Sequence, residues 1–363
     1  MTNKKILILT GPEGHLSIAR SIEQTLAKTH QVVLQEIDEP LFRLYKPIYQ
    51  LFPGFFSIPF KLSAGRLISN IGKQINQRRY YQKIQRLIQD LQPNLVASTY
   101  FMFNPSLKAV LNKKQIPFIT VMTDSWSLHP FLVTREATRH ILFDQKALQT
   151  ALKIDHRANY SALGWFVRDE FEQDYALTEV RQQLQLQPNI FTILVTAGSE
   201  GSATVLKIMP SLIKSTQPLQ VIVACGNNEF LLAKVKAMAK SAAANAQTVI
   251  TALPFAPNLH LYMQAADLVV GKAGPNTVFE SVATHTPFFA ITHISGQEDG
   301  NLDLIKHYQI GYVEENAPKA ARLLAEIIQS PTTLKKFTQP LAELANYNRA
   351  AKTKLLQLVN ELL

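Results

Sequence analysis

The second half of the chain repeats one pattern five times: a short apolar run, then a loop containing Gly, Asn or Pro, then a helical segment. The five runs are FTILVT (191–196), LQVIVA (219–224), TVIT (248–251), DLVV (267–270) and PFFAIT (287–292). Strands that alternate with helices predict a parallel sheet. Ligands of such sheets bind beyond the carboxyl ends of the strands, so we expect the five loops to share one ligand-binding edge.

The first half follows the same pattern. We expect strands at 4–10, 31–37, 94–99, 117–122 and 140–144, and helices at 15–28, 72–91 and 105–114. A polar stretch between 167 and 188 separates the two series, and a long helical pattern over 340–363 ends the chain. The prediction is therefore an α/β protein of two Rossmann-like domains, residues 1–170 and 171–363, the second with a terminal helix.

Composition narrows the function classes. The 363 residues are 47% hydrophobic, enough for two cores, and the single cysteine, Cys225, excludes a disulfide framework and is expected to be a small buried side chain. Neither a G-x-G-x-x-G nor a Walker A motif follows a first strand, which argues against a dinucleotide cofactor and a P-loop. No apolar segment reaches the roughly 20 residues of a membrane span, so we expect no transmembrane helix.

The formal net charge of +10 favours an anionic partner. Residues 41–89 hold nine basic and nine aromatic residues and no acidic one. This composition fits a single-stranded nucleic-acid site, a segment that docks on an anionic membrane, or a helical excursion with buried aromatics and solvated charges. The stretch LFPGFFSIPF (51–60) is too apolar for a nucleotide groove, so we favour a membrane contact, by Arg43, Phe52, Phe55, Phe56, Lys61 and Arg66.

The stretch VVGKAGPNTVFESV (269–282) predicts a strand, a tight turn and a helix. Gly274 allows a positive φ and a close backbone approach, Pro275 suits the first helical position, and Asn276 or Thr277 can cap the helix. A helix N-terminus after such a turn presents N–H groups and the positive end of a dipole, which suit phosphate or sugar hydroxyls. An ordinary connection between a strand and a helix explains this stretch equally well.

KAGPNTVFE (272–280), followed by GQEDGN (296–301), resembles the monogalactosyldiacylglycerol synthases and processive diacylglycerol glucosyltransferases. That family is related to the N-acetylglucosaminyltransferase that makes lipid II. VMTDSWSLHP (121–130), ALGWFVRDEF (162–171) and TAGSEGS (196–202) resemble further segments of the family, in the same order. The resemblance implies a GT-B architecture, in which two Rossmann-like domains face each other across a cleft.

The resemblance also implies a site for a UDP-sugar. The residues expected at the diphosphate are Gly198, Ser199, Glu200, Gly201, Gly274, Pro275, Asn276 and Thr277. Those expected at the uracil are Gly226, Asn227 and Phe255, and Glu280 is expected at the ribose. Gln297 and Glu298 are expected to bind the sugar, and Lys272 and Asn301 to support the site. A plain solvated helix position is the alternative for Glu280. Because helix N-termini can stabilise a leaving diphosphate and the sequence has no clear Asp-x-Asp pair, we expect neither a metal nor another cofactor.

Catalysis needs a general base for the acceptor hydroxyl. His15, at the start of the first helix and facing the cleft, is the candidate, because a helix N-terminus lowers the pKa of a histidine. Asp124 could orient the base or the acceptor, and His129 is expected to be structural. The loop GPEGHL (11–16) departs from the family's Gly-Gly-Gly-His-Arg, and Glu13 adds a negative charge there.

These expectations combine into one function. The protein would be an inverting transferase that moves a hexose from a UDP-sugar to diacylglycerol, giving a β-linkage. It would be cytoplasmic and peripheral on the inner face of the cell membrane, with no nucleic-acid partner. Two alternatives remain open: transfer of N-acetylglucosamine to a polyprenyl-linked cell-wall precursor, and a catalytically degenerate homologue that binds nucleotide or membrane. The sequence does not decide between glucose and galactose.

Overall fold

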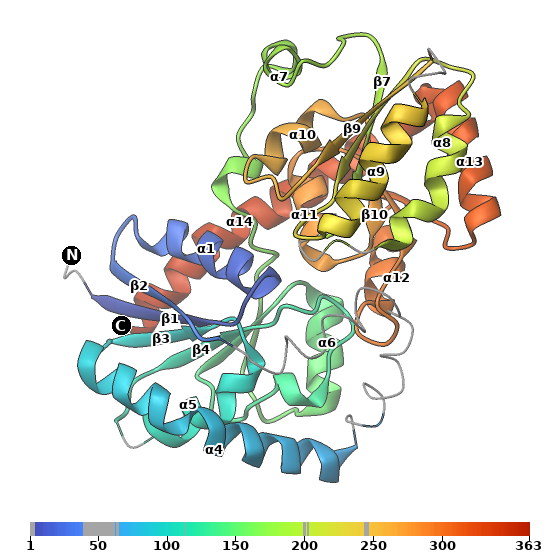
Figure 1. Cartoon of the computed structure of the whole chain (residues 1–363). Coiled ribbons are helices and arrows are strands. Elements are labelled where there is room, and N and C mark those ends of the chain that lie inside the picture. Colours follow the sequence, from blue (N-terminus) through green and yellow to red (C-terminus); the bar gives the residue numbers. More distant parts are fainter. Residues whose placement is uncertain are drawn as a thin grey trace. The chain divides into compact units, whose positions relative to one another are not determined.

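The computed structural model describes residues 4–38, 62, 65–112, 114–198, 201, 203–242 and 247–363, with the backbone alone at 66 and 67. These residues form two compact units (Figure 1). Unit 1 holds the described residues up to Asp169 together with Tyr347–Leu363, and unit 2 holds Glu170–Asn346.

Unit 1 is built on a six-stranded sheet in the order β2-β1-β3-β4-β5-β6, and every neighbouring pair is parallel. Its strands are β1 (Lys5–Thr10), β2 (Gln31–Glu36), β3 (Leu95–Ser98), β4 (Phe118–Val121), β5 (Arg139–Leu142) and β6 (Tyr160–Ala162). Its helices are α1 (Gly14–Leu26), α4 (Arg66–Leu91), α5 (Asn104–Leu111) and α6 (Gln145–Ile154), with 3₁₀ turns at Phe101–Phe103 and Pro130–Leu132.

The two halves of α4 differ in burial. Tyr80, Ile84 and Ile88, spaced four apart, are buried in a core with the β1–β3 region and α5, because this spacing places them on one helix face. Ile68, Ile71 and Ile75 in the first half are 50%, 58% and 59% exposed. The second half of α4 therefore anchors the helix, and the first half presents apolar side chains to solvent.

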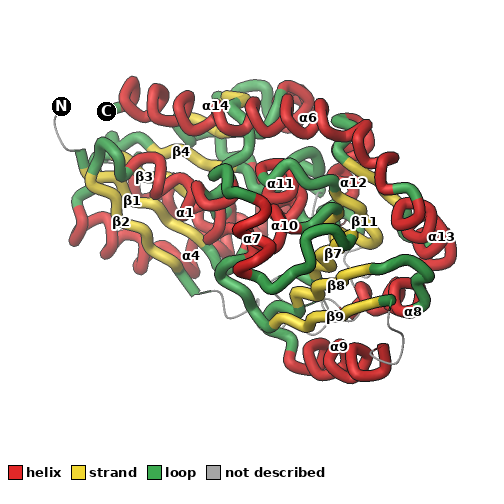
Figure 2. The backbone as a smooth tube through the Cα atoms, turned by 90° about the horizontal axis from the view of Figure 1, so that it is seen from above, coloured by secondary structure: helices red, strands yellow, loops and turns green. Residues whose placement is uncertain are grey.

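Unit 2 contains a second six-stranded parallel sheet, in the order β12-β11-β10-β7-β8-β9 (Figure 2). Its strands are β7 (Phe191–Thr196), β8 (Leu219–Ala224), β9 (Thr248–Leu253), β10 (Leu268–Lys272), β11 (Phe288–Thr292) and β12 (Gly311–Val313). Its helices are α7 (Leu177–Gln183), α8 (Met209–Ile213), α9 (Glu229–Ala242), α10 (Leu259–Ala265), α11 (Pro275–Ala283), α12 (Asp299–His307) and α13 (Ala317–Gln329), with 3₁₀ segments at Asp169–Phe171, Ala203–Ile208 and Pro331–Phe337.

The sheet of unit 2 confirms the prediction from the repeated pattern. The five expected strands are all parallel members of one sheet, so the loops that follow them meet at one edge. The sequence analysis missed β6 and β12. Each has three half-buried residues at the end of its sheet, and neither forms the continuous apolar run by which a buried strand is recognised.

The predicted terminal helix is confirmed as α14, Thr338–Leu362. From Tyr347 onwards it belongs to unit 1. There Asn348 Oδ1 accepts a hydrogen bond from the Trp165 N–H at 2.9 Å, and Lys352 Nζ lies 2.6 Å from Asp169 Oδ1. The last residues of the chain are thus held by polar contacts to the segment that ends the first α/β series.

Across the ranges described above, none of the helices combines the length and the apolarity that crossing a membrane requires. Most of the residues predicted to touch a membrane, Arg43, Phe52, Phe55, Phe56 and Lys61, lie outside the described residues. Arg66 is the first residue of α4.

Candidate active site

His15 lies at the carboxyl edge of the unit 1 sheet, in the first turn of α1 directly after β1. Its Nδ1 is 2.8 Å from the carbonyl oxygen of Thr99, which follows β3, the neighbour of β1. The Thr99 hydroxyl in turn lies 2.7 Å from the Thr10 hydroxyl and 3.2 Å from the His15 carbonyl. Residues that follow two adjacent strands therefore fix the position of the imidazole.

This arrangement sets the protonation state of His15. A carbonyl only accepts, so Nδ1 carries the proton and donates it, which leaves Nε2 with its lone pair. Burial lowers the pKa of His15 to about 4, although the hydrogen bond to Thr99 acts in the opposite direction. The Tyr100 ring packs edge-on against the imidazole, with 4.7 Å between ring centroids. At neutral pH His15 is thus an uncharged imidazole that can accept a proton.

Asp124 and His129 follow β4 on the same sheet. Asp124 is half-buried in the loop. His129 is buried; its Nδ1 accepts a hydrogen bond from the Phe131 N–H at 3.1 Å, and its ring stacks on that of Phe131. These contacts give His129 a structural role at the start of the 3₁₀ turn Pro130–Leu132, and they explain its presence without catalysis.

The unusual loop before His15 is backbone-strained. Glu13 adopts φ 59° and ψ −115°, a region that favours glycine. A glycine at Gly11 is required for a different reason, since a Cβ there would lie 2.8 Å from the Tyr100 ring. The departure from a triple-glycine loop therefore places a charged side chain where the backbone itself calls for glycine.

In unit 2, β10 leads through Ala273 and Gly274 into α11, as expected, with Pro275 at the first helical position. Two details of the prediction are wrong. Gly274 has φ −69°, so its backbone does not need a left-handed conformation, and neither Asn276 nor Thr277 caps the helix, because Gly274 itself occupies the capping position. The glycine instead provides space: a Cβ on Gly274 would lie 3.0 Å from Lys272 Nζ.

The turn at Gly274 is held by buried polar contacts with the segment 294–301. Lys272 Nζ contacts Glu298 Oε1, and the side chains of both residues are less than 10% exposed. Glu298 Oε2 also accepts a hydrogen bond from the Ile294 N–H at 2.7 Å. Asn301 Nδ2 donates to the Ala273 carbonyl at 2.7 Å. The structure therefore joins the two motifs of the family resemblance, and Asn301 supports the turn at Gly274.

Other predicted donor residues that the structure describes follow strands at the same edge. Gly198 and Gly201 follow β7, and Gly226 and Asn227 follow β8; the three glycines have positive φ, 76°, 69° and 58°. At Gly201 a Cβ would lie 2.3 Å from the Cys225 carbonyl, so only glycine fits. Phe255, after β9, is 57% exposed. Ser199 and Glu200 lie outside the described residues.

Glu280 and Gln297 differ in exposure. Glu280, on α11, is only 8% exposed, so the solvated alternative for this residue is wrong. Gln297 is exposed beside the buried Glu298. A carboxylate that is buried on the helix following a Gly-Pro turn is the kind of group that a bound polyol would engage.

His293 is a site residue that the sequence analysis missed. It follows β11, and its Nδ1 lies 2.7 Å from Glu315 Oε1 while its Nε2 lies 2.9 Å from Asp299 Oδ1. Hydrogen bonding to Glu315 is the main cause that raises the pKa of His293, and Asp299 adds to it. Asp299 also accepts from the Gly296 N–H at 2.7 Å. His293 thus clamps the GQEDGN segment, and only the fold brings Glu315 to it.

The single cysteine is confirmed as a small buried side chain. Cys225 has no exposed surface, and burial raises the pKa of its thiol to about 11, so it is not a nucleophile at neutral pH. Throughout the described ranges, no cluster of three His, Cys, Asp or Glu side chains is suited to hold a metal ion.

Comparison with known proteins agrees with this geometry in both units. Residues 16–162 match the monogalactosyldiacylglycerol (MGDG) synthase domain, and residues 192–355 match the glycosyltransferase family 28 C-terminal domain. A processive diacylglycerol β-glucosyltransferase of Staphylococcus carnosus is 26% identical over 357 residues, covering 94% of this chain and 89% of the relative. A probable monogalactosyldiacylglycerol synthase 3 of rice is 24% identical and covers 68% of this chain and 50% of the relative.

Solved structures give the same fold. MurG of Acinetobacter baumannii superposes with a TM-score of 0.59 at 16% identity, covering 98% of this chain and 99% of that chain. Anabaena HepE in complex with UDP-glucose superposes with a TM-score of 0.59 at 14% identity, covering 99% and 98%. The family 28 domain match and the named relatives identify a glycosyltransferase, and the solved structures give it the GT-B fold. Within that class, the two domain matches and the named relatives confirm the resemblance to monogalactosyldiacylglycerol synthases and processive diacylglycerol glucosyltransferases.

Proposed function

We propose that this protein transfers a hexose from a UDP-sugar to diacylglycerol with inversion, giving a β-glycosyldiacylglycerol. The observation that carries the proposal is the neutral imidazole of His15, which a hydrogen bond to the Thr99 carbonyl holds in place. In the second unit of the same chain, β10 is followed by a Gly-Pro turn and the N-terminus of α11. The names of the relatives, which are diacylglycerol β-glucosyltransferases and monogalactosyldiacylglycerol synthases, support the donor and acceptor classes.

In this proposal the edge of unit 2 holds the donor. The N–H groups of the first turn of α11 have no partners within the helix, and together with the helix dipole they suit a diphosphate. The ammonium of Lys272 lies beside the same turn; it is paired with Glu298, and its further N–H groups can donate to a phosphate oxygen. Glu280 would accept hydrogen bonds from the ribose hydroxyls, Phe255 would stack on uracil, and Gln297 and Glu298 would bind the sugar.

The reaction then needs one displacement. Nε2 of His15 accepts the proton of the acceptor hydroxyl, and the hydroxyl oxygen forms a bond to the anomeric carbon. The bond from that carbon to the diphosphate oxygen breaks, and its electron pair stays on UDP. The α11 N-terminus and Lys272 stabilise the charge that develops on the leaving group, without a metal or other cofactor.

The acceptor is a membrane lipid, so the proposal includes a peripheral contact with an anionic membrane on the cytoplasmic side. The exposed Ile68, Ile71 and Ile75 support it, because their spacing of three and four residues forms one apolar stripe on the first half of α4. Farther along the same helix Arg78, Arg79, Lys83 and Arg86 are exposed cations that suit anionic headgroups.

The experiment is the release of UDP from UDP-glucose and from UDP-galactose, each with and without diacylglycerol in anionic liposomes. Release that depends on diacylglycerol, with one donor preferred, is the expected result and names the sugar. UDP binding without release from either donor, with any lipid acceptor tested, would instead indicate a homologue that has lost catalysis at the altered 11–16 loop.

A further inference from the structure

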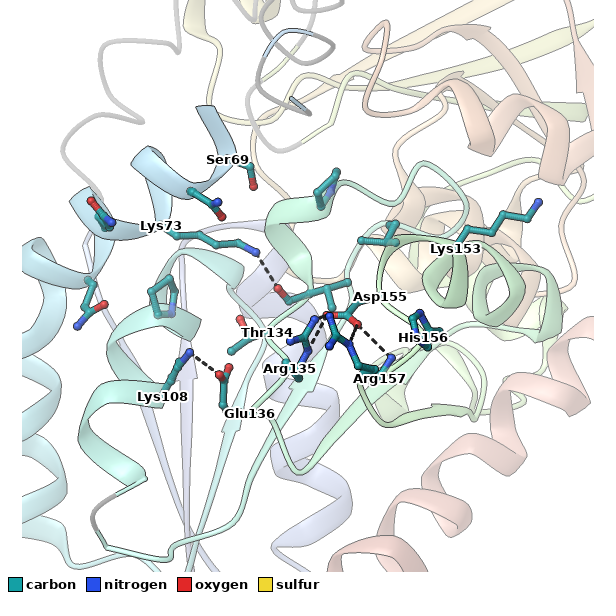
Figure 3. A pocket seen from close by; sticks show the side chains of 17 residues that line it. Ser69, Lys73, Lys108, Thr134, Arg135, Glu136, Lys153, Asp155, His156 and Arg157 are labelled. Carbon is teal, nitrogen blue, oxygen red and sulfur yellow. Dashed lines mark hydrogen bonds and ion pairs between the residues drawn. The ribbon is translucent and has the colours of Figure 1, made fainter. Parts of the chain in front are cut away.

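Unit 1 contains a pocket of about 940 Å³ that the proposed reaction does not use (Figure 3). It lies between the first half of α4 and two loop segments, 133–136 before β5 and 155–157 before β6. None of the predicted catalytic or donor-binding residues lines it. These two segments lead into the amino ends of their strands, whereas His15 and Asp124 follow the carboxyl ends of β1 and β4.

The lining of this pocket is strongly cationic. It contains five cationic side chains and two carboxylates, an excess of three positive charges. The cations are Lys73, Lys108, Arg135, Lys153 and Arg157, and the carboxylates are Glu136 and Asp155. The remaining lining is mainly amide, hydroxyl and proline side chains, so the pocket suits a charged ligand better than an apolar one.

Asp155 organises two of the cations. Its Oδ2 accepts hydrogen bonds from Arg135 Nε at 3.0 Å and Nη2 at 2.7 Å, and its Oδ1 accepts from the Arg157 backbone N–H at 3.0 Å and lies 4.0 Å from Arg157 Nε. Burial opposes ionisation, but these contacts hold the pKa of Asp155 below its ordinary value. One carboxylate thus holds two guanidinium groups side by side and neutralises only one of them (Figure 3).

Lys73 faces them from α4. Its Nζ donates a hydrogen bond to the Val133 carbonyl at 3.0 Å, and among the described residues no carboxylate lies within 4.0 Å of it. Burial lowers the pKa of Lys73, and the more distant Glu136 and Asp155 only partly oppose this. Glu136 is itself paired with Lys108. A half-buried ammonium without an adjacent counter-ion is destabilised, and a bound anion would relieve this.

We propose that this pocket is an anion-binding site for a phosphate-bearing ligand, with Lys73 on one wall and the Arg135–Arg157 pair on the other. Guanidinium groups bind phosphate through paired N–H donors, and a lysine adds a point charge. The volume matches that of small-molecule sites and admits a phosphorylated small molecule or the headgroup of a phospholipid. Both sources present the same chemistry to the pocket.

The pocket is separate from the apolar stripe of α4. Successive residues of an α-helix are rotated by about 100°, so Ser69, Lys73 and Gln77, which line the pocket, lie on the side of α4 roughly opposite to Ile71 and Ile75. Anion binding in the pocket is therefore a separate proposal from membrane contact through the apolar stripe of Ile68, Ile71 and Ile75. It also does not rest on the proposed transferase activity.

The test is calorimetric titration of the full chain with inorganic pyrophosphate. Saturating UDP is present, so that the proposed donor site is already occupied. We expect saturable binding that weakens roughly tenfold or more in Lys73→Met and in Arg157→Gln, because each loses a charge-assisted contact. Lys114→Met removes the same charge from an exposed position of unit 1 outside the pocket and should bind like the wild type.

Arg157→Gln is the variant least expected to affect folding, because the Arg157 side chain is 63% exposed. Its melting temperature should equal that of the wild type.

A second experiment measures flotation with phosphatidylcholine vesicles that contain 20% phosphatidylserine, with and without pyrophosphate. Weaker flotation of Lys73→Met and Arg157→Gln, with competition by pyrophosphate, identifies a lipid headgroup; unchanged flotation with weaker pyrophosphate binding identifies a soluble ligand. The proposal is overturned if no saturable binding is seen, or if Lys114→Met loses as much affinity as the two pocket variants.

Discussion

Each of the two sheets has six strands, and all neighbouring strands within a sheet are parallel. The groups at their carboxyl edges nevertheless differ in kind. In unit 1 the edge consists of side chains that are hydrogen-bonded to the backbone and to one another. Burial at this edge removes water from the imidazole of His15. In unit 2 the edge consists of glycine turns and a helix N-terminus, braced by the buried Lys272–Glu298 pair. Burial keeps an imidazole uncharged, whereas a diphosphate needs backbone that a ligand can approach.

The largest expected effect is on turnover at the edge of unit 1. His15→Ala should lower kcat by roughly 10²–10⁴-fold, because the acceptor loses its general base, while UDP affinity stays unchanged. Turnover of the proposed reaction and UDP binding by calorimetry check this. His307→Ala, which removes an exposed histidine from α12, is the matched control. A His15→Ala enzyme that keeps full turnover would exclude His15 as the base.

The next largest effect is on the stability of unit 2. Lys272→Met leaves the Glu298 carboxylate buried without its ion-pair partner, which should lower the free energy of unfolding by about 3–5 kcal/mol. Urea unfolding measures the loss, with Lys306→Met at an exposed position as control. The double variant Lys272→Met/Glu298→Gln should recover part of the stability. If the double variant is no more stable than the single one, the pair does not brace the turn.

A smaller effect is expected on donor affinity. Glu280→Gln keeps the shape of the buried side chain but weakens its hydrogen bonds to the ribose, so the donor KM should rise by about tenfold. Glu280→Ala should raise it further. Initial rates over a range of donor concentrations check both variants against Glu326→Gln, which lies exposed on α13. An unchanged KM would remove Glu280 from the ribose site.

The smallest effect concerns His293 and pH. Its pKa is raised in the folded chain, so its contribution to stability is complete below the unfolded value of about 6.5 and is lost as pH rises through the folded value. The melting temperature of the wild type should therefore fall relative to that of His293→Gln as pH rises above 6.5. Parallel slopes for the two proteins would show that the clamp does not depend on the charge of His293.

Sequence reasoning succeeded where local pattern decides structure. The parallel sheet, the Gly-Pro start of α11 and the long α14 follow from periodicity and from residues with strong backbone preferences. Both errors at the turn came from assigning a role to a residue type: Gly274 provides space with an ordinary φ, and the caps at Asn276 and Thr277 are not formed.

What the sequence could not give are contacts between distant segments. Lys272 and Glu298 are 26 residues apart, His293 and Glu315 are 22 apart, and His15 meets Thr99 over 84 residues. The pocket in unit 1 is similar: Lys73 counted in the sequence only as one of nine basic residues, and the fold brings it near Arg135 and Arg157. Pairings of this kind depend on strand order, which one sequence does not encode locally.

The central claim is that the edge of unit 1 provides a neutral imidazole as the base. The dependence of kcat/KM on pH tests it most directly, because it reports the pKa of the essential base in the free enzyme. With His15 as base, kcat/KM should decrease toward acid pH with an apparent pKa near 4, and it should be constant from pH 6 to 7. Circular dichroism at each pH separates this limb from unfolding. A limb near 6.5, the ordinary value for histidine, would contradict the account.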